Sequence, residues 1–263
     1  MTKSASGNPA SRRCLARSPV VAWGVAACVT VAACWPAVAR AVEEPTIVAF
    51  SSATLGAPPN PWRFTTLPRK TATRYTVAEL DGLRALKVEA DRSYGNLVHP
   101  LQLHPSDSAT LTWRWRVDQL VEDADLKTKA GDDAAAKLCV LFDLPLDKLS
   151  FAERTTLRLA RAALGEELPT QTLCYVWDNQ LPPGTRLINA FTRRIRFIVL
   201  ESGTAKLSQW VSERRDVVAD YRGLFGDESR GVVPDIIGVA VTADADNTRG
   251  RGLAYFGDIT LSP

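Results

Sequence analysis

Histidines and the common catalytic motifs are scarce in this sequence of 263 residues. The two histidines, His99 and His104, lie five residues apart, and there is no Cys-x-x-Cys pair, so the sequence does not predict a zinc site. It contains no G-x-S-x-G elbow, no G-x-x-x-x-G-K loop and no Gly-rich turn from a strand into a helix. These are the signatures of serine hydrolases, P-loop enzymes and dinucleotide-binding enzymes. Any enzymatic chemistry would therefore depend on carboxylates.

Acidic residues are absent from the first 41 positions, whereas five basic residues lie there: Lys3, Arg12, Arg13, Arg17 and Arg40. The whole chain has 32 basic and 29 acidic residues, so 27 basic residues face 29 acidic ones beyond position 41. The formal charge of +3 thus comes from the N-terminal segment, and the rest of the chain is slightly acidic. Nucleic-acid binding through a broadly basic surface is not expected.

The N-terminal segment has the layout of a secretory signal peptide. An apolar run from Val20 to about Val38 follows the arginines, and small-x-small sites allow cleavage after Ala39 or Ala41. We therefore expect residues 1–41 to be a signal peptide and residues 42–263 to form a single domain in the periplasm or outside the cell.

Three other readings of this segment stay open. The paired arginines resemble the twin-arginine export motif. Val31-Ala32-Ala33-Cys34 resembles a lipoprotein box, in which Cys34 would carry the lipid. The apolar run is also nearly long enough to span a membrane without cleavage. Membrane contact is expected only through a leader that is uncleaved or lipidated.

Short strand-like runs separated by Gly, Pro, Asn and Asp dominate the chain after residue 46. Many short strands with few long helices predict a mainly β fold, an antiparallel β-sandwich or jelly roll, rather than a parallel α/β sheet. The expected strands are Ile47–Ser51, Arg74–Leu80, Leu83–Ala90, Asn96–Leu103, Ala109–Val117, Ala135–Phe142, Thr172–Trp177, Thr192–Glu201, Gln209–Arg215, Ile236–Thr242 and Leu253–Leu261.

Two helices are expected to interrupt the strands. Ser150 and Glu153 have the spacing of a capping box, and the apolar residues that follow predict an inserted helix over residues 150–164. A shorter helix is expected around Val218–Phe225, with Asp216 near its start.

Cys139 and Cys174 are the two cysteines that would remain after removal of the leader. In an oxidising compartment they can form a disulfide, which would close a loop of about 35 residues. Two buried free thiols, packed as small hydrophobic side chains, are the alternative.

Polar clusters follow or precede several of the expected strands. Adjacent carboxylates at Asp132 and Asp133, and Trp177 beside Asp178, suit sugar binding, because an indole covers the apolar face of a pyranose while polar atoms accept its hydroxyl groups. The ligand-binding candidates are Lys129, Asp132, Asp133, Trp177, Asp178, Arg214, Asp220 and Tyr221. The catalytic candidates are Asp132, Asp133 and Asp178. Each cluster could instead consist of turn residues and structural ion pairs.

A weaker pattern, Asp244-x-Asp246-Asn247, places oxygen donors in a turn before the last strand. This spacing suits a structural calcium ion, although the twelve-residue loop of an EF-hand is missing. No other cofactor is predicted.

Several of these blocks occur together, in an order that resembles a known bacterial exported family, the one classed as domain of unknown function 3047. The resemblance covers about residues 46–262, and its final block also resembles the closing strand of galactose-binding-like jelly rolls. The sequence departs from the family pattern at Lys137, where Arg is expected, and at both cysteines, so a disulfide would be particular to this chain. The blocks are Lys127–Phe142, Tyr175–Asp178, Glu201–Gly203 followed by Trp210, Glu213–Gly226 and Gly238–Asp258.

The family resemblance implies no activity, so three functions remain. The first is a non-catalytic β-sandwich that binds a carbohydrate or another ligand of the cell envelope. The second is a carboxylate-dependent glycan hydrolase or lyase, which would need two carboxyl groups about 5 Å or about 6.5–9.5 Å apart. The third is a structural or interaction protein of the envelope.

Overall fold

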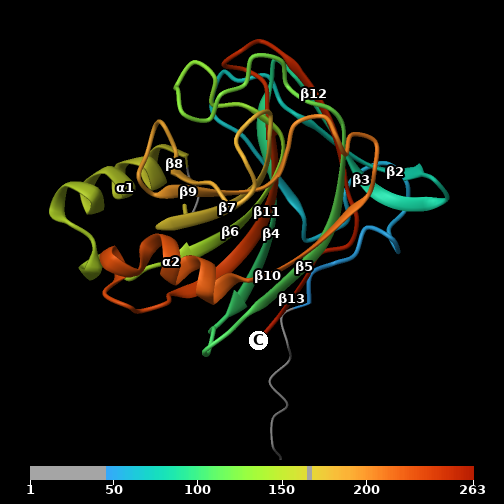
Figure 1. Ribbon diagram of the computed structural model, residues 1–263. Helices are drawn as coiled ribbons and strands as arrows, with labels where there is room; N and C mark the ends of the chain where they lie inside the picture. Colours follow the sequence, from blue (N-terminus) through green and yellow to red (C-terminus); the bar gives the residue numbers. More distant parts are fainter. Residues whose placement is uncertain (1–45, 165–167) are drawn as a thin grey trace, which may run out of the picture. The chain divides into compact units, whose positions relative to one another are not determined.

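The computed structural model describes residues 46–164 and 168–263 (Figure 1). The predicted signal peptide, its cleavage sites and the export and lipidation motifs lie outside the described residues. Within the described part, no helix is both long and apolar enough to cross a membrane.

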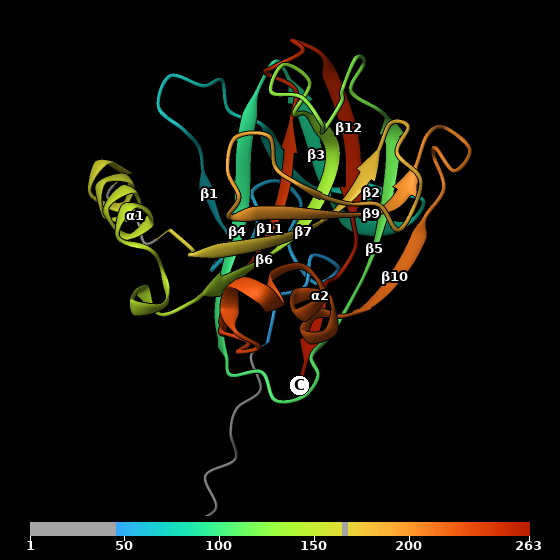
Figure 2. The same cartoon turned by 60° about the vertical axis from the view of Figure 1, so that its left-hand side comes forward.

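Two β-sheets face each other, and most of their strands pair antiparallel (Figures 1 and 2). The seven-stranded sheet has the order β1-β4-β11-β6-β7-β9-β8, and the six-stranded sheet has the order β10-β5-β12-β3-β2 with β13 paired to β5. The fold is therefore a β-sandwich of the jelly-roll kind, as the sequence predicts. The strands are β1 Arg63–Thr65, β2 Arg74–Leu80, β3 Leu83–Asp91, β4 Tyr94–Leu103, β5 Thr110–Gln119, β6 Ala134–Asp143, β7 Gln171–Asp178, β8 Arg186–Ile188, β9 Ile195–Ser202, β10 Val211–Asp216, β11 Asp235–Asp244, β12 Arg251–Phe256 and β13 Thr260–Ser262.

Large aromatic side chains fill the space between the two sheets. Trp113 and Trp115 of β5 point inward because alternate residues of a strand share a face. Their rings lie 5.2 Å from Tyr175 and 6.0 Å from Trp177, measured between centroids, and both partners come from β7 in the opposite sheet. This aromatic layer fixes which face of the seven-stranded sheet is core and leaves its other face outside the sandwich.

Both predicted helices are present. Helix α1, Phe151–Leu164, begins at the expected capping box, where Glu153 accepts from the Ser150 amide at 3.0 Å and from its hydroxyl at 2.7 Å. A short 3₁₀ helix, Leu146–Lys148, precedes it. Helix α2, Val217–Ser229, begins where the Asp216 carboxylate accepts from two backbone amides, and its buried face packs into the core at one end of the sandwich (Figure 2).

Several details differ from the sequence-based expectation. The sequence does not predict strands β1 and β8, and the strand expected over Leu253–Leu261 is two strands, β12 and β13, because residues 257–259 leave the sheet between them. The segment Ile47–Ser51 is not a strand, because side chains bond its backbone: Val48 donates to Nε2 of His99 at 3.1 Å and accepts from the Trp62 indole at 2.9 Å. Helix α2 continues four residues beyond Phe225. Strands β7 and β9 pair in parallel, since the connection between them carries β8 back along the sheet edge.

Candidate functional site

A groove with a volume of about 540 Å³ lies on the outer face of the seven-stranded sheet, the face that points away from the six-stranded sheet. The floor is formed by every second residue of the strands, because successive side chains of a strand point to opposite faces of the sheet. In β6, the side chains of Lys137, Cys139 and Leu141 line the groove, while Leu138 and Val140 belong to the core between the sheets. The walls come from the segment around β1 and from the loop between β8 and β9.

Polar side chains gather at one end of this groove, where the N-terminal end of β6 meets the C-terminal end of β11. They come from five separate segments of the chain, which places groups distant in sequence side by side. The polar residues that line this end are Lys70, Tyr94, Asn96, Asp132, Lys137, Asn189, Thr242, Asp244, Asp246 and Asn247.

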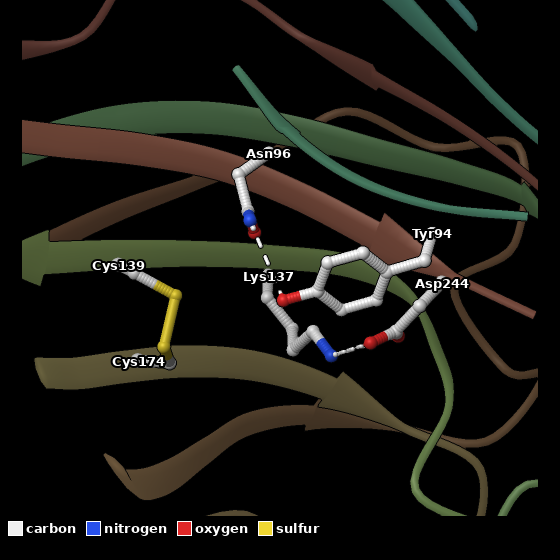
Figure 3. Close-up of a disulfide and its surroundings, with 6 residues drawn as sticks. All are labelled: Tyr94, Asn96, Lys137, Cys139, Cys174 and Asp244. Atoms are coloured by element: carbon white, nitrogen blue, oxygen red, sulfur yellow. Dashed lines mark hydrogen bonds and ion pairs between the residues drawn. A yellow bond between two sulfur atoms is a disulfide. The ribbon is translucent and has the colours of Figure 1, made fainter. Parts of the chain in front are cut away.

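Lys137 and Asp244 form a buried ion pair at the floor of the polar end (Figure 3). The Lys137 ammonium donates to both carboxylate oxygens of Asp244, at 2.7 and 2.8 Å, and the Ala134 amide donates to the same carboxylate at 2.9 Å. Beside the pair, the Asn96 amide lies 3.5 Å from the Tyr94 hydroxyl (Figure 3). The pair neutralises two charges that are only 6% and 7% exposed.

Burial changes the acid–base properties of this pair. It raises the pKa of Asp244 to about 6, against the opposing effect of the Lys137 charge. Burial alone would lower the pKa of Lys137, but the carboxylates of Asp244 and Asp132 outweigh it and raise that pKa above its ordinary value. Lys137 therefore stays charged at neutral pH.

Asp132 lies next to this pair, and one of its two carboxylate oxygens has no hydrogen-bond donor within the described part of the chain. Its Oδ2 accepts from the Asn189 amide at 2.6 Å, whereas its buried Oδ1 has no hydrogen-bond partner among the described residues. Burial raises the pKa of Asp132 as well, although Lys137 and Asn189 oppose the shift. An unpartnered buried carboxylate oxygen is costly, and a donor supplied by a ligand would offset that cost.

Asp133 holds two loops together rather than lining the groove. Its carboxylate accepts from the backbone and side chain of Asn247, both at 3.2 Å, and from the backbone and hydroxyl of Thr248 at 2.7 and 2.8 Å. Before it, a Cβ on Gly131 would lie only 2.7 Å from the Asp125 amide nitrogen, so glycine lets this loop close tightly. The G-D-D and D-x-D-N-T blocks of the sequence therefore meet in space.

The three residues with calcium-like spacing all have protein partners. Asp244 is paired with Lys137, Asp246 forms an ion pair with Lys70, and Asn247 donates to Asp133. Among residues 46–164 and 168–263, no group of three or more His, Cys, Asp or Glu side chains is placed to hold a metal ion. A calcium ion would have to displace two lysines, and its presence stays a prediction.

A disulfide joins Cys139 of β6 to Cys174 of β7 on the floor of the groove (Figure 3). The two residues lie directly opposite each other in the antiparallel pair. Of the two alternatives that the sequence leaves open, the structure contains the disulfide.

Two of the predicted ligand-binding residues lie away from the groove. Trp177 has no exposed surface and packs between the sheets, where its indole donates to the Gly203 carbonyl at 3.2 Å. Asp178 accepts from the amides of Gln180 and Leu181 at 2.8 and 2.6 Å, as an Asx turn at the end of β7. The indole is thus part of the core, because an aromatic residue at this position of β7 faces the opposite sheet.

The candidates from β10 and α2 also lie outside the groove. Asp220 accepts from the Tyr175 hydroxyl and forms a two-bond ion pair with Arg215, at 2.8 and 2.6 Å. Tyr221 is fully buried, and its hydroxyl donates to Gln171. Arg214 is exposed on β10. Lys129 is exposed near the rim of the groove, with its ammonium 5.4 Å from the centre of the Phe191 ring.

A second, smaller hollow of about 400 Å³ opens between β9 and β10. Glu213 lines it, and burial together with the nearby Glu201 carboxylate raises the pKa of Glu213. Arg215, also in the lining, is already bound to Asp220. The Oε1 atom of Glu213 has no hydrogen-bond partner among the described residues, as is true of Asp132 Oδ1, but far fewer polar side chains line this hollow than line the groove.

The structure thus brings together Asp132, Asp133, Asp244, Asp246 and Asn247, and it adds Lys137 as a residue that sequence reasoning did not place in the site. A signal for Lys137 exists in the sequence. It is the single charged residue in the apolar run Ala134–Phe142, and a lysine seldom becomes buried in a strand without a specific partner.

Comparison with solved structures gives distant similarities at low TM-scores. A structure described as TmCBM61 in complex with beta-1,4-galactotriose is 12% identical, with a TM-score of 0.32, and the match covers 77% of this chain and 88% of the other. A family 12 xyloglucanase from Bacillus licheniformis is 9% identical, with a TM-score of 0.40, covering 80% and 99%. The xyloglucanase domain of NopAA from Sinorhizobium fredii is 8% identical, with a TM-score of 0.36, covering 77% and 97%. Similarity at this level says nothing about the ligand of this chain.

No curated protein matches the chain. A family model matches residues 60–260, which is most of the described sandwich. The matched range contains the G-D-D and D-x-D-N-T blocks, whose meeting forms the polar end of the groove. On this match, the chain belongs to the family described as "Protein of unknown function (DUF3047)".

Proposed function

We propose that this protein binds a hydroxyl-rich ligand, a glycan of the cell envelope, in the groove on the outer face of the seven-stranded sheet, without chemically changing it. The observation that carries the proposal is the gathering of charged and amide side chains from five segments at one end of a groove of about 540 Å³. Carboxylates and amides, held by their own bonds, are the groups that recognise sugar hydroxyls.

Asp132 is the central residue of the proposed site. Its buried Oδ1 lacks a donor, and its Oδ2 is fixed by the Asn189 amide, so the carboxylate is held in place for a ligand hydroxyl. Lys137 keeps the surroundings of Asp132 positive enough for the carboxylate to accept a hydrogen bond, since its charge opposes the rise in the pKa of Asp132.

Binding fits the site better than hydrolysis does. A glycosidase needs one carboxyl group that gives a proton and a second that acts as base or nucleophile. Both oxygens of Asp244 accept from Lys137, and Asp133 is bonded to Asn247 and Thr248, so neither is free for such a role. Asp246, the remaining carboxylate in the lining, is paired with Lys70, so Asp132 alone does not supply the two groups.

Affinity electrophoresis tests the proposal. The mature chain, residues 42–263, is run through gels that contain neutral or acidic envelope polysaccharides, with the Asp132→Asn variant beside it. We expect at least one glycan to retard the wild type, and the variant to lose most of the retardation. Asp178→Asn is the matched control, because Asp178 is equally buried but lies outside the groove lining.

Analysis of the glycan after incubation distinguishes a binding protein from a hydrolase. An intact glycan after incubation supports the binding protein, whereas a shortened glycan contradicts it and favours the hydrolase. Equal loss of retardation in both variants would place the ligand elsewhere, and no retardation by any glycan would favour a structural or interaction protein of the envelope. The signal peptide that the sequence predicts over residues 1–41 would place the meeting with the ligand in the periplasm or outside the cell.

A further inference from the structure

The groove changes from polar to apolar along its length, and this change follows the register of the sheet. Rows of residues run across the strands. Near the polar end, one row holds Asn96, Thr242 and Lys137, which are paired neighbours on β4, β11 and β6. All three line the groove.

The next rows toward the other end are apolar except for Arg63, at the β1 edge, and Thr172. The first, read across the paired strands, is Arg63, Val98, Ala240, Cys139, Cys174 and Phe197. The disulfide therefore forms the middle of an apolar floor. Two residues further along the strands, the next row of the floor consists of Pro100, Leu141, Thr172 and Ile195, with Ile237 beside them at the β11 bulge.

The rims of the groove carry exposed apolar side chains beside the polar Arg63, Thr65 and Thr192. Leu67 exposes 40% of its surface on one wall and Phe191 exposes 57% on the other. Leu168 and Pro169 line the groove beyond the end of α1. Exposed large apolar side chains that border one groove indicate a surface that is covered when a ligand binds.

We propose that this half of the groove takes the alkyl chain of an amphiphile, so that the ligand of the protein is a glycolipid or acylated sugar. The inference rests on the proposed function for its polar half. The occupant is aliphatic because the exposed floor is mainly Val, Ala, Leu and Ile with a disulfide. Of the two phenylalanines in the lining, Phe197 is only 2% exposed and Phe191 stands on the rim, so neither offers a ring face on the floor for an aromatic group to stack on. We place the alkyl chain and the sugar in one ligand because the polar and apolar halves belong to one groove.

Calorimetry with methyl, butyl, hexyl and octyl β-D-glucosides, each below its micelle concentration, tests the inference. We expect the dissociation constant to fall about two- to fourfold for each added methylene until the apolar rows are filled, with fourfold as the limit for full burial. A dissociation constant that does not depend on chain length, or no binding by any member of the series, would overturn the inference.

Two variants show whether the chain lies in the apolar rows. Leu141→Asn and Ile237→Asn change half-exposed residues of the floor, so folding is expected to survive. Each should reduce the affinity ratio between octyl and methyl glucoside at least fivefold. Leu159→Asn, on the exposed face of α1, is the matched control and should keep the ratio. An unchanged ratio in both floor variants would contradict the inference.

Octylphosphocholine separates this inference from the proposed function. If both are correct, it binds at least tenfold more weakly than octyl glucoside, because its head group offers no hydroxyl donors. If only the apolar half is correct, the two octyl compounds bind equally and Asp132→Asn has no effect on either. In that case the alkyl site stands and the glycan proposal fails.

Discussion

Replacing Lys137 by Met tests the buried ion pair that forms the floor of the polar end. Removal of one partner from a buried pair costs about 3–5 kcal/mol, because the remaining charge is left without compensation. Asp244 keeps its bond from the Ala134 amide, so we expect the free energy of unfolding to fall by about 3 kcal/mol, the lower end of this range, at pH 8.

The double variant Lys137→Met/Asp244→Asn removes both charges. Replacing a whole buried pair by uncharged groups is often close to neutral, so we expect a loss of about 1 kcal/mol for the double variant. Urea unfolding followed by tryptophan fluorescence measures both losses, with Lys206→Met as a control for an exposed lysine whose partner is Glu201. A double variant that is less stable than Lys137→Met would refute the reasoning, as would a loss below about 1 kcal/mol in the single variant.

The cost of Lys137→Met should also depend on pH. Burial raises the pKa of Asp244 to about 6 from an ordinary value of 3.8. Because the folded pKa is the higher one, this carboxyl contributes most to stability below about pH 4, and the contribution is lost as pH rises through 6. Without Lys137 the folded pKa rises further, so we expect a small destabilisation at pH 5 and a large one at pH 8. Equal losses at the two pH values would contradict this account.

Three further predictions concern the rest of the molecule. Reduction of the Cys139–Cys174 disulfide, or its replacement by two alanines, should lower the free energy of unfolding by about 3–4 kcal/mol for a 35-residue loop, measured by denaturant unfolding with and without reductant. Trp177→Ala should cost about 3–5 kcal/mol because the indole is fully buried, and a melting temperature equal to that of the wild type would contradict this placement. Asp220→Asn should lower the free energy of unfolding by about 1–3 kcal/mol, since the Tyr175 hydroxyl and the Arg215 guanidinium lose their bonds to a charged carboxylate. It should leave glycan retardation intact, because Asp220 lies outside the groove.

The sandwich could be predicted from the sequence because its strands are short, bounded by turn residues and free of helical periodicity. The two helices were also predictable, since the Ser150–Glu153 box and Asp216 are local signals that act within one turn. The parallel pairing of β7 with β9 was not predictable, because strand order depends on contacts between distant segments.

The site was predictable only in part. Asp132, Asp133 and the Asp244–Asn247 turn were identified as polar residues at strand ends, and the structure brings them together. Trp177 misled sequence reasoning because the residues on both faces of β7 are buried, so alternation does not show which face meets the groove. Lys137 was overlooked because its partner lies 107 residues away on β11.

Nuclear magnetic resonance of the mature chain with labelled methyl and indole groups tests the central claim, which is that the ligand lies on the outer face of the seven-stranded sheet. The protein is titrated with the glycan that retards it most strongly in gels, or with octyl glucoside. We predict shifts for the methyl groups of Val98, Leu141 and Ile237, and none for the Trp177 indole. Shifts confined to Ile198, Val199 and Leu200, which line the hollow between β9 and β10, would contradict the claim.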